Sequence, residues 1–77
     1  MHAPDDDAWL HEQSRVLGER IRTARKARKI TQEQLHLRAG LSRNVLQKIE
    51  SGRQNPTYFT LLRIARVLEV PLADLVR

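Results

Sequence analysis

The sequence contains no cysteine, three glycines, three prolines and one residue each of Trp, Tyr and Phe. Without cysteine the chain has no disulfide, no thiolate nucleophile and no thiolate metal site, which fits a reducing compartment. No apolar run approaches the roughly 20 residues of a membrane-spanning helix. The N-terminus carries Asp5, Asp6 and Asp7, where a signal peptide needs positive charge. We therefore expect a cytoplasmic protein that packing alone stabilises and that enters no membrane.

The groups that an enzyme requires are missing as well. No nucleophile stands beside a base, no ligands cluster at metal-binding spacing, and no glycine-rich loop could hold a phosphate. His2 has no second ligand nearby, so we interpret it as a residue of the N-terminal tail. The 77 residues allow one domain with a small core. We expect no enzyme, no cofactor, no metal and no small-molecule ligand.

The net charge of +5 hides an asymmetry along the chain. Residues 1–13 carry three Asp and one Glu without Lys or Arg, which leaves 14 basic against 5 acidic side chains, or +9, on residues 14–77. We divide the chain into an acidic extension at 1–13, partly disordered or extending the first helix, and a basic domain at 14–77. A domain with this much positive charge favours binding to a polyanion such as nucleic acid.

The middle of the chain predicts two short helices joined by a tight turn. Thr31 and Gln34 can form a capping box that starts a helix at 32–39. Gly40 supplies the left-handed conformation that ends it, and Ser42 can cap the next helix.

That next helix has an apolar and a polar side. At 100° per residue, Leu46 and Ile49 share the apolar side. Its other side carries Arg43, Asn44, Gln47 and Lys48. These donors and the absence of acids suit base edges in the major groove of double-stranded DNA, while the alternative is a merely solubilising face. Phosphate contacts, aided by helix N-termini, are expected from Gln32, Arg53, Gln54, Asn55 and Thr57.

The remaining pattern predicts helices on both sides of this pair. A long first helix follows Asp5 with the apolar stripe Leu10, Leu17, Ile21 and Ala24, which Gly18 interrupts at a cost of about 1 kcal/mol relative to Ala. Trp9 and Val16 lie beside the stripe; we favour a flanking contact that closes the core over a dimer contact. Thr57 can cap a fourth helix at 58–68, and a short fifth helix can follow Pro71.

Residues 17–75 resemble the phage-repressor, xenobiotic-response-element type of helix-turn-helix domain. The resemblance is carried by LGERIR, Thr31-Gln32-Glu33, Leu35, Ala39-Gly40, Ser42, Ile49-Glu50, Gly52, Pro56, Leu61-Leu62, Ile64-Ala65 and Leu68. It implies an all-α, five-helix, lambda-repressor-like fold, a structural ion pair between Arg25 and Glu50, and a dimer on two half-sites.

Three positions depart from the family pattern. Lys29 stands where glycine usually ends the first helix, so the exit must be strained or different. His36 replaces the usual alanine between the two motif helices, and Leu37 replaces a polar residue. Either the second helix is displaced outward or the His36 ring points past the rim, which we favour.

The resemblance implies a transcriptional regulator, most simply a dimeric repressor or autoregulator of the phage-repressor or restriction-modification-controller type. For the homodimer we favour the surface formed by Tyr58, Phe59, Leu72 and Val76, with the Trp9 face as second choice. The alternative is an antitoxin or interaction module that binds a partner protein through Leu37 and Phe59.

Overall fold

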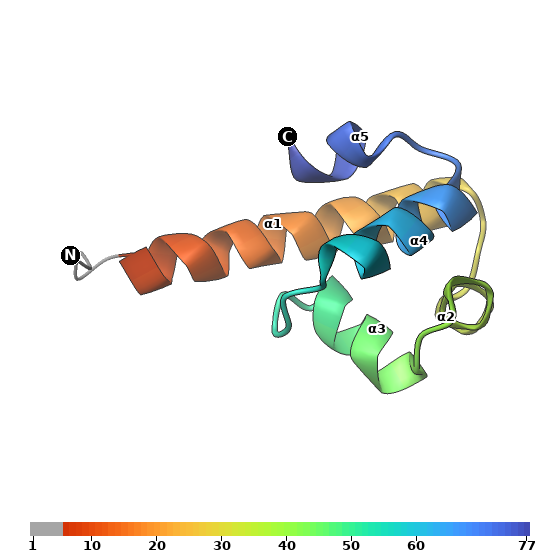
Figure 1. Cartoon of the computed structure of the whole chain (residues 1–77), viewed down its shortest axis with the longest axis horizontal. Coiled ribbons are helices and arrows are strands. Elements are labelled where there is room, and N and C mark those ends of the chain that lie inside the picture. Colours follow the sequence, from red (N-terminus) through yellow and green to blue (C-terminus); the bar gives the residue numbers. More distant parts are fainter. Residues whose placement is uncertain (1–5) are drawn as a thin grey trace.

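The computed structural model describes residues 6–77, which form five α-helices. These are α1 (Asp6–Ala27), α2 (Gln32–Ala39), α3 (Arg43–Glu50), α4 (Tyr58–Leu68) and α5 (Leu72–Val76). The long helix α1 runs along the whole molecule, with α2 and α3 on one side of it and α5 on the other (Figure 1). The expected all-α, five-helix fold is confirmed. No helix in the described part of the chain is long and apolar enough to cross a membrane.

Side-chain caps set the helix starts where the sequence predicts them. The Thr31 hydroxyl accepts from the Gln34 amide at 3.0 Å, and the Gln34 side chain accepts from the Thr31 amide at 2.9 Å. The Ser42 and Thr57 hydroxyls cap α3 and α4 by accepting from the amides of Val45 and Thr60, each at 3.1 Å. Gly40 ends α2 at φ 72°, in the left-handed conformation. The turn between α2 and α3 is therefore defined from both ends.

The core is apolar and draws on every helix. Its fully buried large side chains are Ile21, Leu35, Leu46, Ile49, Ile64, Leu68 and Leu75. The stripe predicted on α1 reaches the core only from Leu17 onward, and Leu10 remains 51% exposed. Trp9 is 61% exposed, so the expectation that it closes the core is wrong. Both residues lie on a part of α1 that extends beyond the other helices (Figure 1).

Gly18 does not interrupt α1, which is continuous from Asp6 to Ala27. A methyl group at this position would lie 2.5 Å from the carbonyl oxygens of Ile49 and Glu50. Glycine therefore lets the C-terminal end of α3 approach the backbone of α1. Gly52, at φ 77°, likewise lets the backbone after α3 approach α1, here at Arg15, one turn before Gly18. An added Cβ at Gly52 would lie 2.7 Å from the Cα of Arg15.

The acidic extension is helical from Asp6 onward, and His2 and Asp5 lie outside the described residues. Arg15 donates to Glu12 at 2.7 and 2.9 Å and to Glu19 at 2.8 Å along one side of the helix. The bonds from Arg15 lower the pKa of the Glu12 carboxyl below its ordinary value of 4.5. Such pairs, at three and four residues apart, support an exposed helix.

Two of the three departures from the family pattern have a visible structural result. Lys29 adopts φ 55°, so the missing glycine leaves a strained left-handed residue at the end of α1. The half-buried His36 ring turns back onto the motif turn, with Nδ1 2.9 Å from the Leu41 carbonyl oxygen. The expectation that this ring points past the rim is therefore wrong, because the Leu41 carbonyl offers it a hydrogen-bond partner. Leu37 is exposed.

Candidate nucleic-acid interface

The candidate interface centres on the outer face of α3. Leu46 and Ile49 anchor the helix in the core, and this anchoring turns the opposite side toward solvent. All four predicted base-contacting side chains are exposed there: Arg43, Asn44, Gln47 and Lys48. The single acid of α3, Glu50, is buried, so this face carries donors and positive charge without a carboxylate.

Glu50 belongs instead to an ion pair between α1 and α3, at the positions that the resemblance implies. Arg25 Nε donates to Glu50 Oε2 at 2.8 Å, and a second guanidinium nitrogen donates to Glu50 Oε1 at 3.1 Å. A further guanidinium bond reaches the Ile30 carbonyl at 3.0 Å. The exposed fractions are only 8% for Arg25 and 7% for Glu50. The bidentate geometry satisfies both buried groups, so neither charge is left without a partner.

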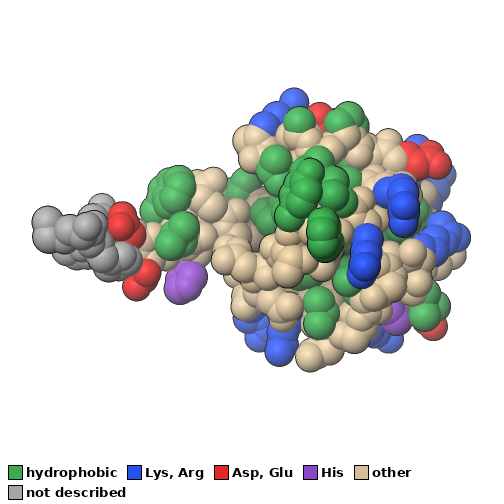
Figure 2. Space-filling model, viewed as in Figure 1, with side chains coloured by type: hydrophobic (Ala, Val, Ile, Leu, Met, Phe, Trp, Pro, Cys, Tyr) green, Lys and Arg blue, Asp and Glu red, His purple; other side chains and the backbone are tan. Residues whose placement is uncertain are grey.

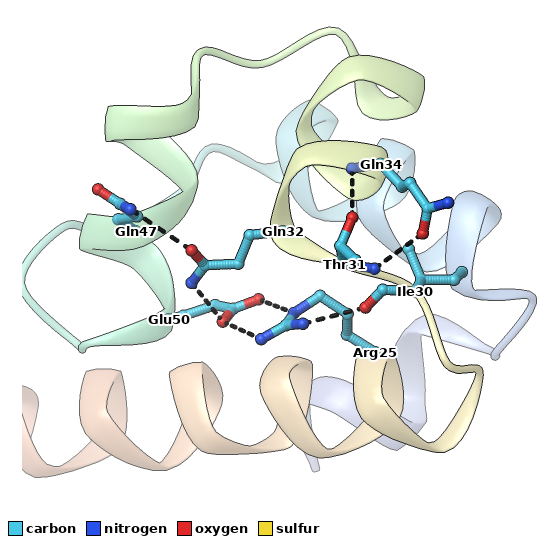
Figure 3. Close-up of polar contacts among 7 residues, drawn as sticks. All are labelled: Arg25, Ile30, Thr31, Gln32, Gln34, Gln47 and Glu50. Atoms are coloured by element: carbon cyan, nitrogen blue, oxygen red, sulfur yellow. Dashed lines mark hydrogen bonds and ion pairs between the residues drawn. The ribbon is translucent and has the colours of Figure 1, made fainter.

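Gln32 extends this ion pair to the surface (Figure 3). Its Nε2 donates to Glu50 Oε1 at 3.1 Å, and its Oε1 accepts from Gln47 Nε2 at 3.4 Å. Sequence reasoning placed Gln32 among the phosphate contacts and missed this link. The side-chain amide is held inside the motif, while the Gln32 backbone amide still lies at the N-terminus of α2.

The other predicted phosphate contacts lie in the segment between α3 and α4. Arg53 is exposed, and its Nε donates to Ser51 Oγ at 3.1 Å. Asn55 accepts from the Ser14 hydroxyl of α1 at 3.2 Å, a bond that nothing in the sequence indicates. Thr57 caps α4 through its hydroxyl, and Gln54 is half-buried. This segment therefore connects the end of α3 both to α1 and to the start of α4.

The residues predicted for the dimer surface lie on α4 and α5. Tyr58 and Phe59 are exposed neighbours with ring centroids 6.3 Å apart. Val76 is exposed and Leu72 is half-buried. Figure 2 shows hydrophobic side chains gathered over the side of the molecule where α4 and α5 lie. Among residues 6–77, no group of three His, Asp or Glu side chains could hold a metal ion.

Comparison with known proteins gives a consistent result. Residues 21–75 match the helix-turn-helix family. The immunity repressor protein of Bacillus phage phi105 is 43% identical over 61 residues, which is 79% of this chain and 42% of that protein. The control protein C.SmaI of Serratia marcescens is 31% identical over 72 residues, covering 94% of this chain and 86% of that protein.

One solved structure is similar to most of this chain. It is the crystal structure of the restriction-modification controller protein C.AhdI from Aeromonas hydrophila, with a TM-score of 0.79 and 29% identity. The match covers 80% of this chain and 94% of that one. By contrast, this chain spans less than half the length of the phage repressor, at 42%.

Proposed function

Because this chain belongs to the helix-turn-helix family, we propose that it is a transcriptional regulator that binds double-stranded DNA in a sequence-specific manner. The observation that carries the proposal is the outer face of α3, which offers Arg, Asn, Gln and Lys without an acid. A regulator of this kind acts by occupying its site rather than by catalysis, and it works where the DNA is, in the cytoplasm. The similarity to a phage repressor and to controller proteins supports the repressor or autoregulator type.

Within this proposal, α3 reads the bases. Arg43 can bridge the two acceptors of guanine, and Asn44 or Gln47 can pair bidentately with adenine, each with about 1–3 kcal/mol of discrimination. Lys48 lies on the same face as Gln47, one residue further along. The hydrogen bond that Gln47 donates to Gln32 restricts the rotamers of Gln47, which reduces the entropy lost when Gln47 binds a base.

The segment after α3 fixes the orientation on the DNA. Arg53 is the cation of this segment, and the N-termini of α2 and α4 present backbone amides to phosphates. We keep Gln54, Asn55 and Thr57 as phosphate contacts. For Gln32 we assign that contact to the backbone amide, since the side chain is engaged by Glu50 and Gln47.

We further propose that the protein binds as a homodimer. One recognition helix reads too few base pairs for useful selectivity, and a two-fold dimer places two helices on two half-sites. The exposed aromatic residues Tyr58 and Phe59, together with Leu72 and Val76, supply an apolar surface on the side of α4 and α5. Phe59→Asp should weaken dimer formation and cooperative DNA binding without reducing helicity, as measured by sedimentation and circular dichroism.

Two variants test the division between base and phosphate contacts. A binding site is first selected from random DNA with the full chain. Arg43→Ala should then weaken that site by about 1–3 kcal/mol and relax the preference at one position per half-site. Arg53→Ala should weaken all sequences similarly and reduce the salt slope by about one per subunit. Equal losses of specific and random binding in Arg43→Ala would refute base reading by α3.

A salt titration separates DNA binding from the alternative of a partner-binding module. Contacts to several phosphates should lower the affinity on the order of a hundredfold or more between 50 and 200 mM salt. Apolar binding of a partner protein through Leu37 and Phe59 should hardly change over this range. An apparent DNA affinity that is insensitive to salt would contradict the proposed function.

A further inference from the structure

The first two turns of α1, residues 6–13, form an arm that extends beyond the body of the molecule (Figure 1). The principal extents of 40 × 23 × 20 Å reflect this elongation. Trp9, Leu10 and Gln13 stand three, four and seven residues after Asp6, which places the four residues on one face of the helix. The large side chains of Trp9 and Leu10 are 61% and 51% exposed there. The arm thus presents an apolar face with acidic residues at its beginning.

A second face with the same spacing lies on the outside of α4. Phe59, Leu62, Arg63 and Arg66 are all exposed, with Phe59 at 70%. Within the described part of the chain, neither Arg63 nor Arg66 has an ion pair. Figure 2 shows hydrophobic side chains on the arm and on the body from the same direction, with Lys or Arg beside those on the body. The two faces are complementary: one is apolar and acidic, the other apolar and basic.

We propose that the arm of one protomer packs on the outer face of α4 of a second copy of this chain. Trp9 and Leu10 then cover Phe59 and Leu62, while the aspartates of the arm lie near Arg63 and Arg66. This inference rests on the proposed homodimer and extends its interface from α4 and α5 to the N-terminal part of α1.

The rigidity of α1 argues for exchange between copies. The helix is continuous through Gly18, where its backbone touches the end of α3, so the arm cannot fold back onto α4 of its own chain. In a two-fold dimer the same contact forms twice, and both arms and both α4 faces are covered together.

The negative charge of the arm argues against DNA as its binding partner. The arm carries Asp6, Asp7 and Glu12 and no Lys or Arg, so phosphates repel it. The body of a second copy carries the net charge of +9 on residues 14–77 and attracts it.

The single tryptophan of the chain makes the contact observable without a label. The full chain is diluted through the concentration at which sedimentation shows dimer dissociation. If the arm docks on the second copy, Trp9 emission shifts to longer wavelength on dilution, and acrylamide quenches it more strongly in the monomer. Trp9 contacts within one chain would not depend on concentration.

Matched variants then assign the contact. Trp9→Asp should raise the dimer dissociation constant at least about tenfold, because each dimer loses two buried indoles. Leu37→Asp is the control: Leu37 is similarly exposed, at 65%, but lies on α2, and its variant should dimerise normally. Reversing the arm charges (Asp6→Lys with Asp7→Lys) or the α4 charges (Arg63→Glu with Arg66→Glu) should each weaken the dimer. Combining both reversals should recover most of the affinity.

The outcomes separate this inference from the proposed dimer. A dimer whose Trp9 emission and quenching equal those of the monomer would overturn the arm contact and leave the dimer on α4 and α5 standing. A chain that stays monomeric at every concentration and on its selected DNA site would overturn both. Equal effects of Trp9→Asp and Leu37→Asp, or no recovery in the combined charge reversal, would also contradict the assigned surface.

Discussion

Replacing Gly18 by alanine tests the close approach between α1 and the end of α3. The sign of the change in stability shows whether Gly18 is only a weak position in a helix or is required for the close approach of the two helices. In an isolated exposed helix, alanine is more favourable than glycine by about 1 kcal/mol. In this structure the added methyl group would lie 2.5 Å from two backbone carbonyl oxygens, those of Ile49 and Glu50. Because neither neighbour is a side chain, no change of rotamer can relieve the clash.

The magnitude follows from the distance that must be gained. Ordinary contact begins at 3.4 Å and the added methyl carbon would lie at 2.5 Å, so α1 and α3 must separate by about 0.9 Å. Overpacking of this kind costs about 1–3 kcal/mol. We expect a cost at the upper end of this range, about 3 kcal/mol, because backbone atoms resist the methyl group on both sides. The gain in helix propensity of about 1 kcal/mol offsets part of it, so the net loss of stability is about 2 kcal/mol.

Urea unfolding followed by circular dichroism measures this loss. Gly40→Ala serves as the control, because its Cβ would have no neighbour within 4 Å and only the φ of 72° is unfavourable. The control should lose about 1 kcal/mol without changing the packing of α1 on α3. If Gly18→Ala instead gains about 1 kcal/mol in stability, the close approach of the two helices is refuted.

Two further predictions concern residues that the fold places under constraint. Arg25→Ala should destabilise the protein by about 3 kcal/mol in urea unfolding, because it leaves the carboxylate of Glu50 buried without its partner. A loss of stability below about 1 kcal/mol would show that water replaces the guanidinium. Lys29→Gly should raise the stability by up to about 1 kcal/mol, because Lys29 adopts φ 55° and glycine does so without strain. A decrease in the melting temperature of Lys29→Gly would contradict that explanation.

The helix boundaries were predictable because local chemistry determines them. Thr31, Ser42 and Thr57 each offer a hydroxyl directly before an amphipathic run, and Gly40 provides the left-handed exit. These signals act over three or four residues, so they can be recognised without knowledge of the tertiary structure. The apolar side of α3 was predictable for the same reason, since the period of the helix alone separates Leu46 from the polar residues.

The contacts between distant segments were not predictable from local pattern. Gly18 was interpreted as a weak point of a helix, but its role depends on carbonyl oxygens that come from α3, more than thirty residues later. The N-terminal arm shows the opposite case, a pattern that predicts burial where the structure leaves the side chains exposed. Its apolar spacing is that of a core-facing helix, yet Trp9 remains 61% exposed. Spacing indicates which face is apolar but does not indicate what covers it.

Gln32 shows how the core and the candidate DNA-binding face are connected. At the C-terminal end of α3, the backbone rests on Gly18 and the Glu50 side chain is held by Arg25. Gln32 binds the same carboxylate and also Gln47, so the orientation of one predicted base-reading side chain depends on a buried ion pair. The exposed side chain of Arg43 makes no such bond within the described chain, and only the helix backbone positions it. A change in the core at Glu50 should therefore affect the base preference of Gln47 more than that of Arg43.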